Sequence, residues 1–77
     1  MPKAYIVVLT ATGTTPSVVE AIRALDGVTE AHVVAGEFDV MVEAEADELV
    51  DLKSLLTDGI HHIDGVGHTR THVVLDE

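Results

Sequence analysis

The sequence predicts an α+β fold of the ferredoxin-like βαββαβ type, with a four-stranded antiparallel sheet and both helices on one face. Apolar, β-branched segments alternate with amphipathic segments in the order strand, helix, strand, strand, helix, strand. The tripeptide Asp-Gly-Val also occurs twice, at 26–28 after the first helix and at 64–66 before the last strand, which indicates two similar halves. The chain has 77 residues, so we assign residues 1–77 to one domain.

The first half of the chain is predicted to fold as strand, helix and strand. Ala4–Leu9 is continuously apolar, which is typical of a strand buried on both faces. Thr15 is the expected N-cap of a helix whose first residue is Pro16, and Gly27 is expected to end it. A second strand runs from 28 to 35. The buried stripe of the helix has helical spacing: Val18, Ile22 and Leu25.

A hairpin turn is predicted at Gly36 and Glu37, followed by a third strand from Phe38 to Ala44. Gly36 suits the turn because glycine adopts positive φ without steric cost. Asp39 lies just inside the third strand, between two apolar residues. Its carboxylate has two open roles: it accepts hydrogen bonds from amides of the turn, or it binds a ligand.

The last third of the chain is predicted to contain the second helix and the fourth strand. Asp47 is the expected N-cap and Gly59 the expected end of the helix. Residues 60–64 form a loop, and the last strand runs from about 66 to 75. The apolar stripe of the helix consists of Leu49, Leu52 and Leu56.

One face of the predicted sheet has no helix to cover it. The first strand is nevertheless apolar on both faces, with Tyr5, Val7 and Leu9 on one face and residues 4, 6 and 8 on the other, so whichever face is uncovered has an apolar centre. An apolar patch of this kind is unfavourable in water and marks an interaction surface. We therefore expect a second copy of the chain to pack on it, giving a dimer whose two sheets face each other.

Composition excludes several classes of protein. The chain has no Cys, which excludes disulfides and thiolate metal sites. No apolar segment approaches the ~20 residues of a membrane span and no signal peptide is evident, so a cytoplasmic protein without membrane contact is expected. The formal charge is −10, and the 4 Lys and Arg residues are scattered, which argues against direct binding of nucleic acid. The acidic excess favours a halophilic source.

Catalytic and metal-ligating patterns are absent from the sequence. His68 and His72 share a strand face but lie about 13 Å apart, too far to chelate one ion. Ser17 and Ser54 lie on predicted helices, distant in sequence from any His, so no nucleophile–base pair is evident. We expect neither an enzyme, nor a metal site, nor a cofactor. Whether the histidines bind a metal, as His61 and His62 could together with a neighbouring subunit, or sense pH stays open.

The segment Gly36-Glu37-Phe38-Asp39 resembles the Gly-x-aromatic-Asp element in the effector (RAM/ACT-like) domain of Lrp/AsnC, or feast/famine, transcription regulators. Residues 65–75, with Thr69 and Thr71 in a Thr-x-Thr pattern, resemble the last strand of that domain. The resemblance covers nearly the whole chain in the same element order. It implies a dimeric α/β barrel, dimers that assemble into octameric rings or other higher forms, and amino-acid binding in clefts between dimers.

The resemblance also implies which residues bind the ligand. Asp39 would accept a hydrogen bond from its ammonium group, and two threonines of the last strand would supply hydroxyl groups. The implied ligand-binding set is Gly36, Glu37, Phe38, Asp39, Thr69 and Thr71.

Full regulators of this family carry a helix-turn-helix domain before the effector domain. Here the first strand begins within a few residues of Met1, so the chain resembles a stand-alone effector domain, with a haloarchaeal source implied by its charge. The expected function is sensing of a small molecule, in particular an amino acid, by a homo-oligomer that modulates transcription by itself or with full-length Lrp/AsnC regulators. Two alternatives stay open: an oligomerisation domain without a ligand, and a small dimeric α/β-barrel enzyme.

Overall fold

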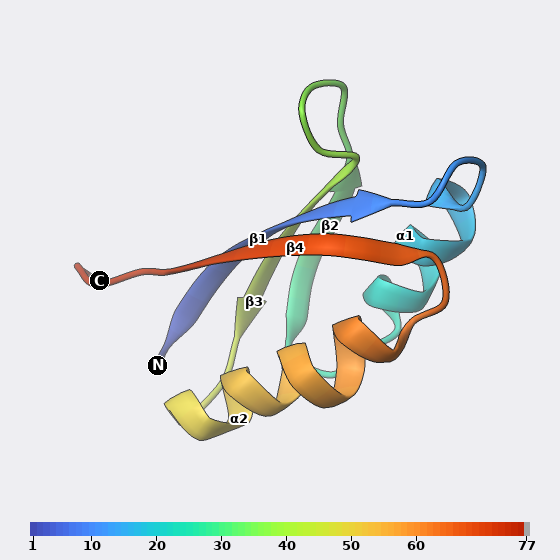
Figure 1. The fold of residues 1–77 in the computed structure, drawn as a ribbon. Helices are drawn as coiled ribbons and strands as arrows, with labels where there is room; N and C mark the ends of the chain where they lie inside the picture. Colours follow the sequence, from blue (N-terminus) through green and yellow to red (C-terminus); the bar gives the residue numbers. More distant parts are fainter. Residues whose placement is uncertain (77) are drawn as a thin grey trace.

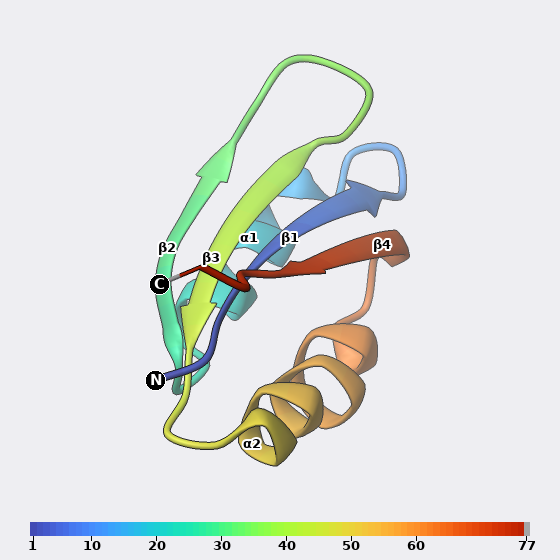
Figure 2. The same cartoon turned by 90° about the vertical axis from the view of Figure 1, so that its left-hand side faces the viewer.

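A sheet forms one layer of the molecule and helices form the other (Figures 1 and 2). The computed structural model describes residues 1–76. The strands occur in the spatial order β2-β3-β1-β4, and every neighbouring pair is antiparallel. This confirms the predicted ferredoxin-like fold. The elements are β1 (Lys3–Thr10), α1 (Thr15–Arg23), β2 (Val28–Val33), β3 (Val40–Glu45), α2 (Leu49–Ser54) and β4 (Val66–Val73).

The hydrophobic core lies between the helices and one face of the sheet. Alternate residues of β1 and β3 point into it, as a strand period of two requires. Each buried aliphatic side chain contributes about 1.5–3 kcal/mol through the apolar surface that it removes from water. The fully buried residues include Ala4, Ile6 and Val8 of β1, Val40 and Ala44 of β3, Val18 and Ile22 of α1, and Leu52 and Ile60 from the second helical segment.

The second helical segment is longer than predicted. A π-helical turn, Leu55–Gly59, and a 3₁₀ turn, Ile60–His62, follow α2 directly. The predicted helix end at Gly59 and the predicted loop over 60–64 are therefore wrong by a turn. Ile60 is completely buried, so its packing in the core holds the extra turn in place.

Both predicted N-caps are wrong by one residue. The N-cap of α1 is Thr14 and that of α2 is Glu48, and neither side chain makes a capping hydrogen bond. The Thr14 hydroxyl donates to the Ala11 carbonyl at 2.7 Å. The Thr15 hydroxyl, predicted as the cap, contacts that of Thr10 at 2.7 Å. Both threonine hydroxyl groups thus bond to other partners, whereas the sequence preference for threonine at an N-cap considers only the helix itself.

Two other elements, α1 and β4, are shorter than predicted. Helix α1 ends at Arg23 rather than at Gly27, and β4 ends at Val73 rather than at Leu75. Leu49, predicted in the apolar stripe, is 59% exposed because it is the first residue of α2.

The connection between β2 and β3 is a loop over residues 34–39 rather than a tight turn at Gly36 and Glu37. Gly36 has φ 159°, close to an extended conformation, so it does not supply the left-handed turn that we predicted. The base of the loop is still paired: Asp39 N donates to Val8 O at 3.0 Å, and Val34 N donates to Asp39 O at 2.9 Å. Figure 2 shows the loop projecting beyond the end of the sheet.

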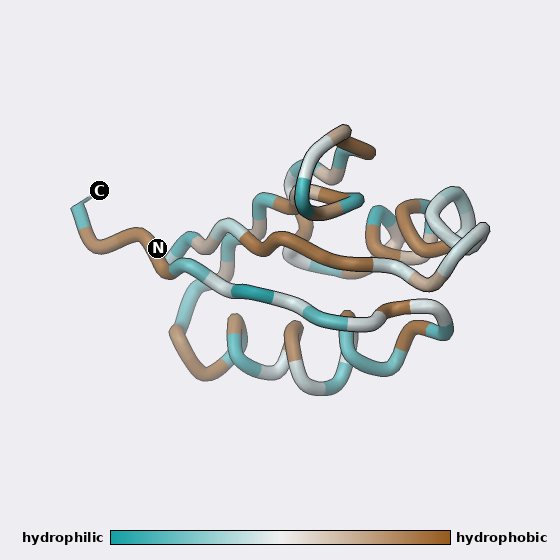
Figure 3. The backbone as a smooth tube through the Cα atoms, turned by 45° about the horizontal axis from the view of Figure 1, so that its top comes forward, coloured by the Kyte–Doolittle hydropathy of each residue, from teal (hydrophilic) through white to brown (hydrophobic). Residues whose placement is uncertain are grey.

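The sheet face opposite the helices is open, and its centre is apolar. Tyr5, Leu9 and Met41 are 41%, 37% and 45% exposed. Figure 3 shows β1 as a hydrophobic segment running beside a mostly hydrophilic β4. We call this surface the open face. Its apolar centre agrees with the prediction from the sequence.

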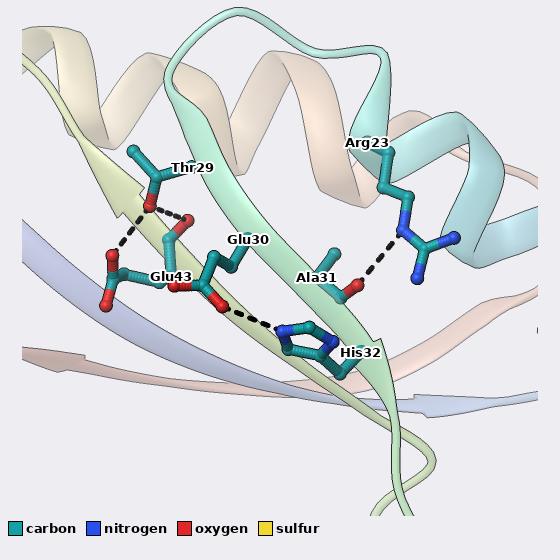
Figure 4. Close-up of polar contacts among 6 residues, drawn as sticks. All are labelled: Arg23, Thr29, Glu30, Ala31, His32 and Glu43. Atoms are coloured by element: carbon teal, nitrogen blue, oxygen red, sulfur yellow. Dashed lines mark hydrogen bonds and ion pairs between the residues drawn. The ribbon is translucent and has the colours of Figure 1, made fainter.

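Strand β2 forms one edge of the sheet, and Arg23 covers part of that edge. Its Nε donates to Ala31 O at 3.0 Å (Figure 4), and its guanidinium also pairs with Glu20 at 3.2 Å. A charged side chain across an edge strand discourages pairing with a strand of another chain. Self-association through the β2 edge is therefore disfavoured. Among residues 1–76, no helix has the length and apolar character needed to cross a membrane.

Candidate functional site

A hollow of about 420 Å³ lies at the end of the sheet, where the 34–39 loop faces the first half of β4. This volume is within the range of about 300–1,000 Å³ that is usual for small-molecule sites. Three predicted site residues meet here: Glu37 and Phe38 from the loop, and Thr69 from β4. The full lining is Leu9, Glu37, Phe38, His68, Thr69 and Arg70.

The lining of the hollow combines two opposite charges with apolar surface. Glu37 supplies a carboxylate and Arg70 a guanidinium, and neither forms an ion pair with another residue in the described part of the chain. Phe38 and Leu9 supply an aromatic ring and an aliphatic surface. A small zwitterion matches this set, because its carboxylate suits the fork of a guanidinium and its ammonium group suits a carboxylate.

Asp39 lies at the base of the loop and does not line the hollow. Its Oδ2 accepts hydrogen bonds from Thr10 N at 2.9 Å and from Thr10 Oγ1 at 3.1 Å. Since the Thr10 hydroxyl donates to Asp39, the 2.7 Å contact with Thr15 Oγ1 requires the Thr15 hydroxyl to be the donor. Asp39 therefore ties the loop to the end of β1 and the start of α1. The carboxylate of Asp39 therefore bonds to Thr10, and not to the amides of the turn that were one of its two expected partners.

Gly36 and Thr71 also lie outside the lining. Thr71 pairs with Ile6 and Thr69 with Val8, which confirms that the two threonines share a sheet face. That face is the one turned toward the helices. Only Thr69 is near enough to the end of the sheet to reach the hollow, where its hydroxyl contacts His61 Nε2 at 2.8 Å.

Leu9, His68 and Arg70 were not predicted as site residues. The alternation of side chains along a strand could have indicated Arg70. Arg70 lies between Thr69 and Thr71, so its side chain points to the opposite face of the sheet, which is the open face. The sequence did not show that the loop and β4 enclose a hollow at that position, because this depends on the shape of a loop that was predicted as a tight turn.

A second hollow of about 270 Å³ adjoins the first and shares His68 and Thr69 with it. His61 also lines it, but His62 does not. Within residues 1–76, no group of three or more His, Cys, Asp or Glu side chains has the geometry to hold a metal ion.

The chain is similar to proteins of one family. Residues 3–77 match the family described as the Lrp/AsnC ligand binding domain. The leucine-responsive regulatory protein of Haemophilus influenzae is 35% identical over 57 residues, which cover 74% of this chain and 34% of that protein. This chain thus spans about a third of the length of the curated relatives that it matches.

Two solved structures extend the comparison. PHS023 from Pyrococcus horikoshii is 36% identical, with a TM-score of 0.92 over 100% of this chain and 93% of that chain. The regulator NMB0573 from Neisseria meningitidis, solved as a complex with L-Met, is 19% identical. Its TM-score is 0.86 over 99% of this chain and 51% of that chain, which shows a shared fold.

Proposed function

Because the chain belongs to the Lrp/AsnC ligand-binding domain family, which consists of transcription regulators and not of enzymes, we propose that it senses a small molecule and modulates transcription through assembly. The observation that carries this proposal is that Glu37 and Arg70 bring opposite charges to one hollow, and neither is paired with another residue of 1–76. A domain that served only for oligomerisation would have no need of such a lining.

The proposed ligand is an α-amino acid. Its carboxylate binds Arg70, its ammonium group binds Glu37, and its side chain packs on Phe38 and Leu9. The complex of the Neisseria regulator with L-Met supports this ligand class. In this proposal Asp39 positions the loop. The contacts predicted for Gly36 and Thr71 with a ligand stay predictions.

The proposed mechanism is linkage between ligand binding and assembly. A second copy covers the open face, and a ligand held where copies meet favours the assembled state over the separate chains. Assembly with full-length Lrp/AsnC regulators would let this chain change their oligomeric state without itself contacting DNA. Direct DNA binding is disfavoured by the formal charge of −10.

A thermal-shift screen of the twenty amino acids, in high salt and with light scattering, tests the proposal. At least one amino acid should raise the melting temperature. A ligand at 100 times its Kd adds about 2.7 kcal/mol of stability. In a domain of this size that is a rise of well over 5 °C, at about 4–8 °C for each kcal/mol. No shift with any amino acid at millimolar concentration would refute amino-acid sensing.

The variant Glu37→Gln should weaken binding of the amino acid found in that screen by at least about tenfold. It removes a charge-assisted hydrogen bond that is worth about 1.5–3 kcal/mol, and it keeps the shape of the side chain. Titration calorimetry measures the effect. Glu48→Gln is the matched control, because Glu48 is exposed at the N-cap of α2 and its side chain makes no capping bond. Equal affinities for Glu37→Gln and wild type would remove Glu37 from the site.

The halophilic source and the cytoplasmic location stay predictions from the sequence. Melting temperatures measured at low and at multimolar salt test the first, because a salt-adapted acidic protein should be markedly more stable in the concentrated salt.

A further inference from the structure

The second hollow, of about 270 Å³, is lined by hydrogen-bond donors and by no carboxylate. It adjoins the first hollow at His68 and Thr69, which line both, and His61 adds a second imidazole. Among residues 1–76, Glu37 is the only acidic residue in the lining of either hollow, and it lies in the first. The second hollow therefore suits a group that accepts hydrogen bonds.

His61 reaches this hollow because of the irregular end of the second helical segment. The π-helical turn Leu55–Gly59 is followed by the 3₁₀ turn Ile60–His62, which lies close to β4 (Figures 1 and 2). Ile60 is completely buried and anchors the 3₁₀ turn, while its neighbour His61 is exposed. Single turns of π-helix are rare and occur frequently at functional sites. The local structure thus holds His61 beside β4.

The side chains of His61 and Thr69 form a pair that keeps one donor for a third group. His61 Nε2 and Thr69 Oγ1 lie 2.8 Å apart. A neutral imidazole has one N–H and a threonine side chain has one O–H, and their mutual hydrogen bond uses one of these two protons. In either tautomer of His61, the other proton is left for an acceptor.

The backbone of β4 adds a donor at the free edge of the sheet. Within residues 1–76, β4 is the last strand in the order β2-β3-β1-β4, so one of its edges has no neighbouring strand. Val74 N donates to Lys3 O at 2.8 Å, and bonded pairs alternate with non-bonded pairs along an antiparallel ladder. By this alternation Arg70 belongs to a bonded pair and Thr69 to a non-bonded pair. The N–H of Thr69, which lines both hollows, consequently points outward to that edge.

These donors are a local exception on an acidic protein. The chain has 14 Asp and Glu residues against 4 Lys and Arg, with a formal charge of −10. Arg70 and two of the five histidines nevertheless line the two hollows, whereas one carboxylate does. An anionic group is repelled by the chain as a whole and finds hydrogen-bond donors at this position. The two hollows therefore favour a ligand with a second negative group.

We infer that the second hollow binds the side chain of the amino-acid ligand and selects an acidic amino acid, glutamate or aspartate. The inference rests on the proposed function, in which the α-carboxylate binds Arg70 and the ammonium group binds Glu37. It adds the class of side chain that the site accepts, because the two hollows adjoin and one ligand can occupy both.

The side chain of the ligand has an apolar stem and a charged end, and the two hollows match these parts. Its methylene groups pack on Leu9 and Phe38 in the first hollow. Its carboxylate accepts hydrogen bonds in the second hollow from the pair formed by His61 and Thr69 and from the imidazole of His68. Charge-assisted hydrogen bonds are roughly twice as strong as neutral ones. A side chain with an apolar end leaves the same donors without a partner, and a site built for hydrogen bonds rejects such a ligand strongly.

Calorimetric titration of the wild-type chain tests the specificity. L-Glu and L-Asp are compared with their amides, L-Gln and L-Asn, which have nearly the same shape without the charge. L-Met and L-Leu, whose side chains have apolar ends, complete the set. The better of the two acids should bind at least about tenfold more tightly than its amide and than either apolar amino acid.

Two variants then test the second hollow itself. His61→Phe keeps a ring at this position and removes its N–H donor, and Thr69→Val keeps a β-branched side chain and removes its hydroxyl group. Each should weaken binding of the better acid at least about tenfold and reduce its preference over the amide. The matched control is His62→Phe, because His62 follows on the same 3₁₀ turn and lies outside both linings. It should bind the acid as wild type does.

The contrary outcomes separate this inference from the proposed function. An apolar amino acid or an amide that binds as tightly as the acids would overturn the inferred specificity, although amino-acid sensing would stand. Wild-type affinity for the acid in both His61→Phe and Thr69→Val would show that its side chain lies outside the second hollow. An equal loss in His62→Phe would remove the specific role of His61. If no amino acid binds the wild-type chain, the proposed function fails as well.

Discussion

Replacing Gly65 with alanine should destabilise the protein by about 2–6 kcal/mol. Gly65 has φ +99°, a conformation that costs a residue with a side chain about 1–3 kcal/mol. The new Cβ would lie 2.7 Å from Thr14 Oγ1 and 2.9 Å from Val18 Cγ2. Val18 is fully buried, so it cannot move aside without disturbing the core, and overpacking of this kind costs about 1–3 kcal/mol more.

Urea unfolding at a fixed protein concentration measures this effect as a lower midpoint with an unchanged slope. The matched control is Gly13→Ala. Gly13 also has positive φ, +81°, but nothing lies within 4 Å of the position of its Cβ. It therefore isolates the backbone cost. Equal losses in the two variants would show that the close approach of α1 to Gly65 has no energetic role.

Replacing Asp39 with alanine should weaken amino-acid binding by at least about tenfold while the dimer stays intact. The variant removes the acceptor for both Thr10 N and Thr10 Oγ1, and it leaves part-buried donors without a partner at a cost of about 1–3 kcal/mol. The 34–39 loop then loses its side-chain link to β1. Glu37 and Phe38 on that loop are no longer held opposite β4.

The conservative variant Asp39→Asn separates a positioning role from a direct contact. The amide oxygen of Asn still accepts from Thr10, so a positioning residue should recover most of the lost ligand affinity. If Asp39 binds the ammonium group directly, Asp39→Asn should bind as weakly as Asp39→Ala even though it recovers the stability. Wild-type affinity of Asp39→Ala in calorimetry would remove Asp39 from both roles.

The order and spacing of the apolar segments predicted most of the fold correctly. In β1, Ala4, Ile6 and Val8 are completely buried while Tyr5 and Leu9 lie on the open face, so the prediction that this strand is buried on both faces is wrong for the single chain. This pattern reflects burial on each face, which is the largest energetic term in a small domain. The element order and the uncovered face of the sheet follow from it.

The errors concern side chains whose partners are distant in sequence. Asp39 bonds to Thr10, 29 residues away, whereas the rules for turns consider only near neighbours. The Thr15 hydroxyl contacts Thr10 instead of capping α1. The shape of the 34–39 loop depends on these contacts, so the hollow and its Arg70 could not be derived from local patterns.

The oligomeric state of the wild-type chain tests the central claim most directly, because both the proposed site and its regulation require a covered open face. Sedimentation equilibrium at micromolar protein in high salt should give twice the mass of the chain or a higher multiple. A clean monomer under these conditions, with Tyr5 and Met41 left in water, would contradict the account.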